Sequence, residues 1–152
     1  MANTNVAQKE PSAAQEPKRW SHGAFYWNEL MTPDVERAKR FYADTLGWRF
    51  EGMPMPSAPD AGDKVAGMTY WIVYAGEQMV GGMFEMNCTE MAGAPEQWLG
   101  HIAVDDVDKR YEKALAAGAT TMRPPFDVPM VGRIAIINQP GGAAIGWITP
   151  AS

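Results

Sequence analysis

The sequence of 152 residues contains a single cysteine, Cys88. One cysteine cannot form an intrachain disulfide, and it cannot supply the several thiolates of a structural zinc cluster. Cys88 is therefore interpreted as a small, polarisable residue of a strand or linker. Neither a disulfide within the chain nor a thiolate cluster holds this fold together.

Basic residues are also scarce. The chain has 13 Lys and Arg against 18 Asp and Glu, a formal net charge of −5 and a sequence pI of about 5.0. Because nucleic-acid binding depends on basic patches that neutralise phosphates, this balance argues against a nucleic-acid partner.

Long apolar runs are absent as well. No segment approaches the roughly 18 apolar residues of a membrane-spanning helix, so no membrane association is expected. The first residues, “MANTNVAQKEPSAAQEPKRW”, lack the apolar centre of a secretion signal. From these two absences we expect a cytoplasmic protein.

What the chain does have is an ordinary globular composition, 46% hydrophobic and 20% charged, and the length of one domain. Residues 1–20 carry almost no periodic apolar signal and are predicted to form a disordered tail. Residues 21–152 are predicted to form the domain.

The domain contains an internal repeat, which is the main clue to its fold. The segment “DVER” at residues 34–37 opens a predicted helix that ends near Gly47. The segment “DVDK” at residues 106–109 opens a second helix that ends near Gly118. A short apolar strand precedes each helix, “AFYWNELM” in the first copy and “LGHIAV” in the second.

Local signals specify both helices. Thr32 is the expected N-cap of the first helix, with Pro33 at its first position. Gly47 supplies the left-handed residue that ends it, and Asp106 is expected to cap the second helix. An apolar stripe at helical spacing lies on the first helix and consists of Val35, Ala38, Phe41, Tyr42 and Leu46.

Three strand candidates follow each helix. They are “WRFE”, “MTYWIVYA” and “QMVGGMFEM” in the first half, and “ATTMRPPF”, “GRIAIIN” and “AAIGWIT” in the second. Residues 52–64 are a predicted loop, in which Met53 and Met55 could close over a pocket. The pattern is β-α-β-β-β twice, with module one at residues 21–87, a linker at 88–97 and module two at 98–150.

The segments “FYWNELMTPDVERAKRFYADTLGW”, “VDDVDKRYEKALAAGA” and “QPGGAAIGWI” resemble signatures of the vicinal oxygen chelate superfamily, which includes glyoxalase I, bleomycin resistance proteins and ring-cleaving dioxygenases. “WNELMTPD”, “PPFDVPMVGR” and “QPGGA” are similar to the branch typified by the N-terminal domain of the A-factor growth-disturbance suppressor. The resemblance covers residues 22–150. It implies an α+β fold in which two paired β-α-β-β-β modules form a curved mixed sheet around a cleft. It also implies a two-fold homodimer.

Metal-using members of this superfamily take ligands from the first and last strand of each module. The resemblance places these four positions at Trp27, near Gly82, at Gly100 or His101, and at Gly146. Tryptophan and glycine side chains cannot coordinate a metal, which needs three or more converging donors. The sequence therefore predicts no metal ligand and no cofactor.

Glu29 and His101 are the candidate catalytic residues. Strand alternation puts Glu29 on the same face as Trp27. His101 lies five residues before Asp106, as Glu29 lies five before Asp34, and this register would bring the two together as a general acid and base. The helix stripes align best with an offset one residue longer, which turns His101 away. Both registers remain open, as does a purely structural role for both side chains.

Aromatic residues of the strands are candidates for contact with a flat apolar or cationic ligand. By alternation, half of them should face the cleft. Arg133 is a candidate partner for a ligand carboxylate, the alternative being an ion pair with Asp127 in its own hairpin. The predicted ligand-binding residues are Trp27, Tyr70, Trp98, Arg133 and Trp147.

The predicted function is the binding of a small aromatic or apolar molecule in a metal-free cleft, with or without acid–base catalysis by Glu29 and His101. The alternative is a metal-dependent lyase or dioxygenase of the same superfamily, with a relocated divalent metal site at Glu29, His101 and Glu85. Metal content separates these two interpretations. Loss of activity in a Glu29→Gln variant would separate a metal-free enzyme from a binding protein.

Overall fold

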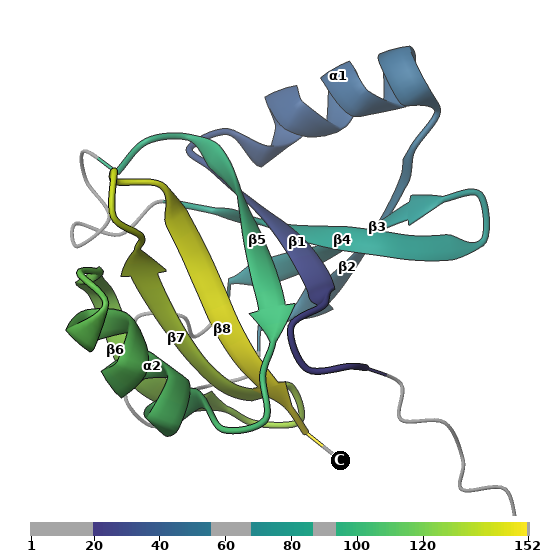
Figure 1. Cartoon of the computed structure of the whole chain (residues 1–152). Coiled ribbons are helices and arrows are strands. Elements are labelled where there is room, and N and C mark those ends of the chain that lie inside the picture. Colours follow the sequence, from purple (N-terminus) through teal and green to yellow (C-terminus); the bar gives the residue numbers. More distant parts are fainter. Residues whose placement is uncertain (1–19, 56–67, 87–93, 152) are drawn as a thin grey trace, which may run out of the picture.

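The computed structural model describes residues 20–55, 68–86 and 94–151 (Figure 1). Of the predicted tail, only Trp20 falls in these ranges. Cys88, residues 56–64 of the predicted loop and residues 88–93 of the predicted linker lie outside them. No helix within the described ranges is both long enough and apolar enough to cross a membrane.

Each half of the chain has the predicted order of one strand, one helix and three strands. Module one consists of β1 (Phe25–Thr32), α1 (Val35–Leu46), β2 (Arg49–Pro54), β3 (Thr69–Ala75) and β4 (Gln78–Glu85). Module two consists of β5 (Gln97–Ala103), α2 (Val107–Ala116), β6 (Thr120–Val128), β7 (Gly132–Asn138) and β8 (Ala144–Pro150). The predicted α+β fold is confirmed.

The strands form one mixed, curved sheet in the order β2-β3-β4-β1-β5-β8-β7-β6 (Figure 1). At its centre β1 and β5, the first strands of the two modules, pair antiparallel. Each of them also pairs in parallel with the last strand of its own module, β1 with β4 and β5 with β8. The two modules therefore meet edge to edge along β1 and β5.

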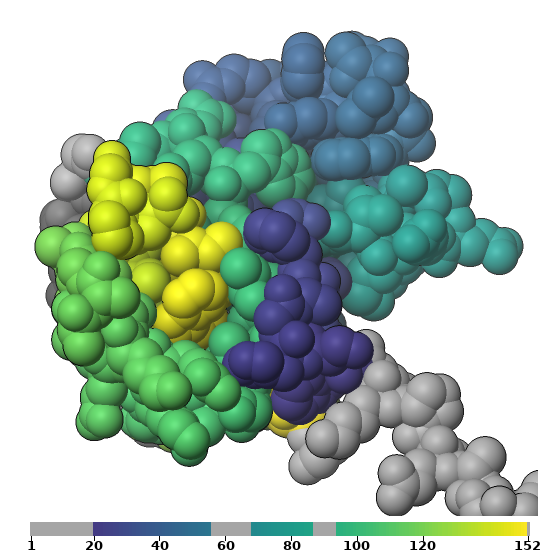
Figure 2. All heavy atoms as spheres, viewed as in Figure 1, coloured from purple at the N-terminus to yellow at the C-terminus, as the bar shows by residue number. Residues whose placement is uncertain are grey.

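Both helices cover the same face of this sheet. α1 packs over Leu30 and α2 packs over Ile102. Leu30 pairs with Trp98, which lies four residues from Ile102 on the same strand, so alternation places all three on one face. Figure 2 shows this face, with α1 in blue, α2 in green, and β1 (purple) and β8 (yellow) visible between them.

The opposite face is called the helix-free face below. On the four central strands it includes Trp27, Glu29, Met31, Gly82, Phe84, Gln97, Leu99, His101, Ala103, Ala144, Gly146 and Ile148. Part of this face is core, since Met31, Phe84 and Leu99 form a buried cluster. The polar side chains among these residues are therefore the ones that need an explanation.

The N-cap of α1 is Asp34, and not the predicted Thr32. The Asp34 carboxylate accepts a hydrogen bond of 2.9 Å from the backbone N–H of Arg37, and the Thr32 hydroxyl accepts one of 3.1 Å from the N–H of Asp34. β1 runs up to Thr32, which fixes the turn that precedes the helix. Gly47 ends α1 with φ 69°, and Asp106 caps α2, both as predicted.

β2 extends to Pro54, so Met53 lies in a strand and not in the predicted loop. It pairs with Tyr70 of β3, and the next pair joins Pro54 to Thr69. Because β2 is an edge strand, the missing N–H of Pro54 can face away from its partner. Pairing with β3 therefore outweighs the turn composition of “GMPMP”.

The structure settles the register of the repeat. Asp34 and Asp106, the two N-caps, are equivalent, and they lie 72 residues apart. Glu29 and His101 are separated by the same 72 residues, and each pairs with a glycine on the last strand of its module. The repeat offset is therefore 72 residues, the shorter of the two alternatives, and His101 shares the helix-free face with Glu29.

Candidate functional site

A chain of hydrogen bonds fixes Glu29 on the helix-free face. Glu29 is partly buried, and its Oε2 atom accepts a hydrogen bond of 2.7 Å from the Tyr70 hydroxyl. That hydroxyl accepts one of 2.9 Å from Nε1 of Trp27. Within the described residues the carboxylate has no further partner, so Oε1 is the atom left for a bound molecule.

Tyr70 reaches Glu29 across an intervening strand, since β4 separates β3 from β1. Glu29 stands beside Gly82 of β4. A Cβ atom at Gly82 would overlap the hydroxyl and ring of Tyr70, so the absent side chain opens the passage that the phenol uses. This contact was not predicted from the sequence. The signal available for it was Gly81–Gly82, a glycine pair inside a strand pattern.

The protonation of Tyr70 is strongly biased. Burial raises the pKa of its phenol far above the ordinary value of 10.0, and the adjacent Glu29 carboxylate raises it further. The hydrogen bond from Trp27 lowers this pKa but is the smallest of the contributions. Tyr70 is therefore a neutral donor in the folded protein, and it holds Oε2 of Glu29 in one position.

Tyr70 should ionise only when the protein unfolds. Because its folded pKa is raised, its contribution to stability is fully present below pH 10.0, the unfolded value, and is lost as the pH rises above it. In an alkaline titration, part of the tyrosinate absorbance should appear together with the loss of the far-ultraviolet circular dichroism signal. The Tyr70→Phe variant should lack the part of the tyrosinate absorbance that appears on unfolding. If that absorbance change keeps its size in the variant, the assignment to Tyr70 is wrong.

His101 is 4% exposed and lies directly opposite Trp27 on the neighbouring strand. Its ring lies against Gly146 of β8, where a Cβ atom would be only 2.9 Å from Nε2 and would overlap Cδ2. Nδ1, on the other edge of the ring, is buried and has no hydrogen-bond partner in the described part of the chain. Leu99, and not His101, is the residue opposite Glu29.

The positions that the resemblance assigned to metal ligands do come together on the helix-free face. Trp27, Gly82, His101 and Gly146 are neighbours on the four central strands, whereas Gly100 faces the helix side. Of the four, His101 alone has a side chain of a type that binds metals. Rings fill the space at both glycines, Tyr70 at one and His101 at the other.

The residues of the relocated alternative do not converge either. Glu85 pairs with Thr32 on the helix side, and its Oε1 accepts a hydrogen bond of 3.4 Å from the backbone N–H of Val35. Across residues 20–55, 68–86 and 94–151, no three His, Cys, Asp or Glu side chains are placed to hold a metal ion. The described residues therefore do not fit a divalent metal.

Purified protein should accordingly contain substoichiometric zinc, nickel, manganese and iron by elemental analysis. Chelator treatment should leave its melting temperature unchanged, because no donor set of the described chain would lose an ion. Protein reloaded with each metal and desalted serves as the control. Stoichiometric metal whose removal lowers the melting temperature would contradict the prediction.

Trp98 and Trp147, two of the predicted ligand-binding residues, lie on the helix side of the sheet. The prediction that they face the same cleft as Glu29 is therefore wrong. Nε1 of Trp98 donates a hydrogen bond of 2.9 Å to the Tyr42 hydroxyl of α1. Trp147 packs beneath α2. Both occupy the strand positions that alternate with those of Leu99 and His101. Trp27 and Tyr70 are the predicted aromatic contacts that stand beside Glu29.

Arg133 is engaged within the fold. Its Nε and Nη2 atoms donate to Asp108 of α2 at 2.7 and 3.0 Å, and Nη1 donates to Asp127 at 2.9 Å. The hairpin ion pair with Asp127, the alternative to a ligand contact, is therefore present, and a second carboxylate joins it. Arg133 ties α2 to the β6–β7 hairpin on the helix side.

Comparisons of sequence place this chain among known proteins. It is 36% identical over 129 residues to CFP32 of Mycobacterium tuberculosis, whose name marks it as a candidate glyoxylase, covering 85% of this chain and 45% of that protein. It is 28% identical over 132 residues to DnrV of Streptomyces peucetius, named an anthracycline biosynthesis protein, covering 83% and 46%. The chain thus spans about half the length of these curated relatives.

Solved structures share the fold at low sequence identity. A methylmalonyl-CoA epimerase variant from Streptomyces coelicolor superposes with a TM-score of 0.58 at 16% identity, covering 87% of this chain and all of that one. The hypothetical protein BH1468 from Bacillus halodurans gives a TM-score of 0.59 at 13% identity, with coverages of 87% and 97%. The family model matches residues 24–146. The chain therefore belongs to the Glyoxalase/Bleomycin resistance protein/Dioxygenase superfamily.

Proposed function

We propose that the helix-free face binds a small aromatic or apolar molecule without the aid of a metal, and that Glu29 recognises a hydrogen-bond donor on that molecule. The observation that carries the proposal is the Trp27–Tyr70–Glu29 chain. It fixes one carboxylate oxygen and leaves the other without a partner among the described residues.

The surroundings of Glu29 support this choice of ligand. Trp27 and Tyr70 are partly buried rings beside the carboxylate. The partly exposed Ile136 and Met86 pack on the buried cluster of the same face. Apolar neighbours keep water away from part of a carboxylate, and a charge without hydrogen-bond partners is costly in such surroundings. A ligand that donates a hydrogen bond to the carboxylate takes the place of that water and is therefore bound favourably.

His101 contributes to this site differently from the sequence-based expectation. It shares the face with Glu29, but the described structure has no hydrogen bond between them. Its buried Nδ1 without a partner marks a second polar point on the same face. Proton transfer to or from a bound molecule would use Glu29 as the base, since its carboxylate is the more accessible of the two groups.

A thermal-shift screen tests the proposal. Small aromatic phenols, anilines and amides, which can donate a hydrogen bond, should raise the melting temperature. The matching methyl ethers and N,N-dimethyl compounds, which cannot donate one, should raise it less. Glu29→Gln should remove the preference for donors, whereas Glu77→Gln, at an exposed turn, should keep it. A preference that survives in Glu29→Gln would refute the role of Glu29.

A further inference from the structure

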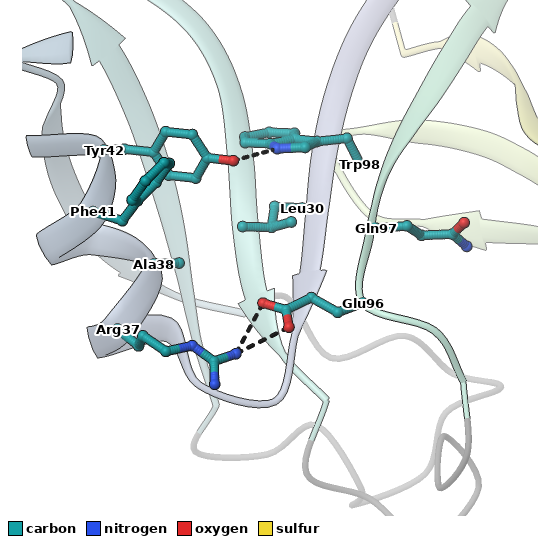
Figure 3. A pocket seen from close by; sticks show the side chains of 8 residues that line it. All are labelled: Leu30, Arg37, Ala38, Phe41, Tyr42, Glu96, Gln97 and Trp98. Carbon is teal, nitrogen blue, oxygen red and sulfur yellow. Dashed lines mark hydrogen bonds and ion pairs between the residues drawn. The ribbon is translucent and has the colours of Figure 1, made fainter. Parts of the chain in front are cut away.

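Trp98, which the function proposed above does not use, lines a cavity of about 370 Å³ on the helix side of the sheet. The cavity lies between α1, β1 and the start of β5 (Figure 3). Its floor is the buried pair Leu30 and Ala38, and its sides include Phe41 and Tyr42 of α1. Its volume lies within the range of small-molecule pockets, about 300–1,000 Å³.

The aromatic walls of this cavity hold one another in place. The Tyr42 ring stacks on Trp48 at 4.9 Å between centroids, and Trp98 meets the two rings edge-on at 5.7 and 5.9 Å. The hydrogen bond from Nε1 of Trp98 to the Tyr42 hydroxyl closes the cluster. Rings fixed in this way form a surface that loses little conformational entropy when a flat molecule binds.

The two charged groups at one end of the cavity, Arg37 and Glu96, are paired with each other. Nη2 of Arg37 donates to both carboxylate oxygens of Glu96, at 3.1 and 2.9 Å (Figure 3). The Thr32 hydroxyl also donates to Glu96, at 2.7 Å. The hydrogen bond from Thr32 and the guanidinium of Arg37 both lower the pKa of Glu96, so that it stays ionised beside its partner. Among the described residues that line the cavity, no unpaired charge is therefore left for an ionic ligand.

The hydroxyl proton of Tyr42 remains available at the aromatic end of the cavity. The Tyr42 hydroxyl accepts the hydrogen bond from Trp98, and no acceptor for its own proton is present in the described residues. A carbonyl group is an acceptor of the right kind for that proton. Phe41 and Trp98 are 57% and 37% exposed, so a flat ligand would also cover aromatic surface that now faces solvent.

The fold alone does not account for this cavity. The equivalent positions of the second module, 72 residues away, replace Phe41 and Tyr42 by Lys113 and Ala114. α2 accordingly lacks the aromatic pair that α1 presents beside the neighbouring strand. The aromatic cavity is therefore a feature of the first module of this chain.

We propose that the cavity between α1 and β5 binds a neutral, planar aromatic molecule with one carbonyl acceptor, at a site separate from Glu29. The rings of Tyr42 and Trp98 contact its faces and edges, and the Tyr42 hydroxyl donates to its carbonyl oxygen. The Arg37–Glu96 pair offers no unpaired charge to a carboxylate or an amine, so the loss of hydration of such a group on binding would not be compensated.

Calorimetric titration of the full chain with three matched probes tests this proposal. 2-Acetylnaphthalene should bind, 2-ethylnaphthalene should bind more weakly, and 2-naphthoate should not bind. Ala38→Leu, which fills the floor of the cavity, should weaken both neutral probes at least tenfold, on the order of the loss of a buried contact surface. Ala116→Leu, the same change at an exposed position of α2, should leave them unchanged.

Tyr42→Phe provides a variant that leaves the floor of the cavity as it is. It should weaken the ketone by about threefold to tenfold relative to 2-ethylnaphthalene, the effect of one hydrogen bond. Glu29→Gln should leave both probes unaffected, which separates this site from the one proposed above. Undetectable ketone binding, equal losses of both probes in Tyr42→Phe, full binding in Ala38→Leu or lost binding in Glu29→Gln would each overturn the proposal.

Discussion

A Glu29→Leu variant should fold, lose about 1–3 kcal/mol of unfolding free energy and bind any ligand found in the donor screen at least tenfold more weakly. Stability falls because the Tyr70 hydroxyl, which donates to Glu29 at 2.7 Å, is buried and would lose its acceptor. Binding falls because the variant removes the carboxylate oxygen that no described residue uses. Chemical denaturation and titration with the ligand measure the two effects.

A double variant shows whether the loss of stability comes from the stranded hydroxyl. Glu29→Leu combined with Tyr70→Phe replaces both partners by apolar groups, which is often nearly neutral for stability. The double variant should therefore recover most of the stability lost in Glu29→Leu, while its ligand binding stays low. Trp27 loses its acceptor in this variant, but it is only partly buried, so water can take its N–H.

Two results would refute this account of Glu29. Additive losses in the double variant would mean that Tyr70 and Glu29 are not energetically coupled. Unchanged ligand binding in Glu29→Leu would mean that the carboxylate serves the fold alone. The first result would remove the stabilising role of the Tyr70–Glu29 hydrogen bond, and the second would leave Glu29 with a structural role alone.

The secondary structure and topology could be predicted because their signals are local and repeated. The “DVER” and “DVDK” helix starts mark equivalent points of two modules, and glycine ends the first helix as expected. The first N-cap was placed two residues early, since Thr32 and Asp34 are both good caps and the choice depends on where β1 ends. Such a choice is made by tertiary pairing and not by propensity.

The candidate site could be predicted only in part. The alternation of β1 placed Trp27 and Glu29 on one face, but the face of His101 depended on a register that differed by one residue between two alignments. The faces of Trp98 and Trp147 depend on the same parity. The Tyr70–Glu29 contact was not predicted, because it joins strands that are not neighbours, and the glycine pair on the strand between them does not by itself say which side chain fills the space.

Glycines on the last strand of each module, Gly82 on β4 and Gly146 on β8, make room for the rings of the helix-free face. A substitution at Gly146 tests this packing through its effect on stability. A Cβ atom at this position would overlap Cδ2 of His101 and lie 3.0 Å from its Cγ. His101 is 4% exposed, so its ring has little room to move. Gly146→Ala should therefore cost about 1–3 kcal/mol of stability, as overpacking of a buried site does.

The control for Gly146→Ala is Gly100→Ala on β5. The nearest atom to a Cβ there is Cε1 of Phe25 at 3.1 Å, and Phe25 is 72% exposed, so its ring can move aside at little cost. His101→Ala combined with Gly146→Ala should be more stable than the sum of the single losses predicts, since removing the ring makes room for the new methyl group. Denaturation curves of these variants measure both effects. If the His101 and Gly146 losses simply add, the imidazole does not occupy the space that Gly146 leaves open, and the close packing of the helix-free face has another cause.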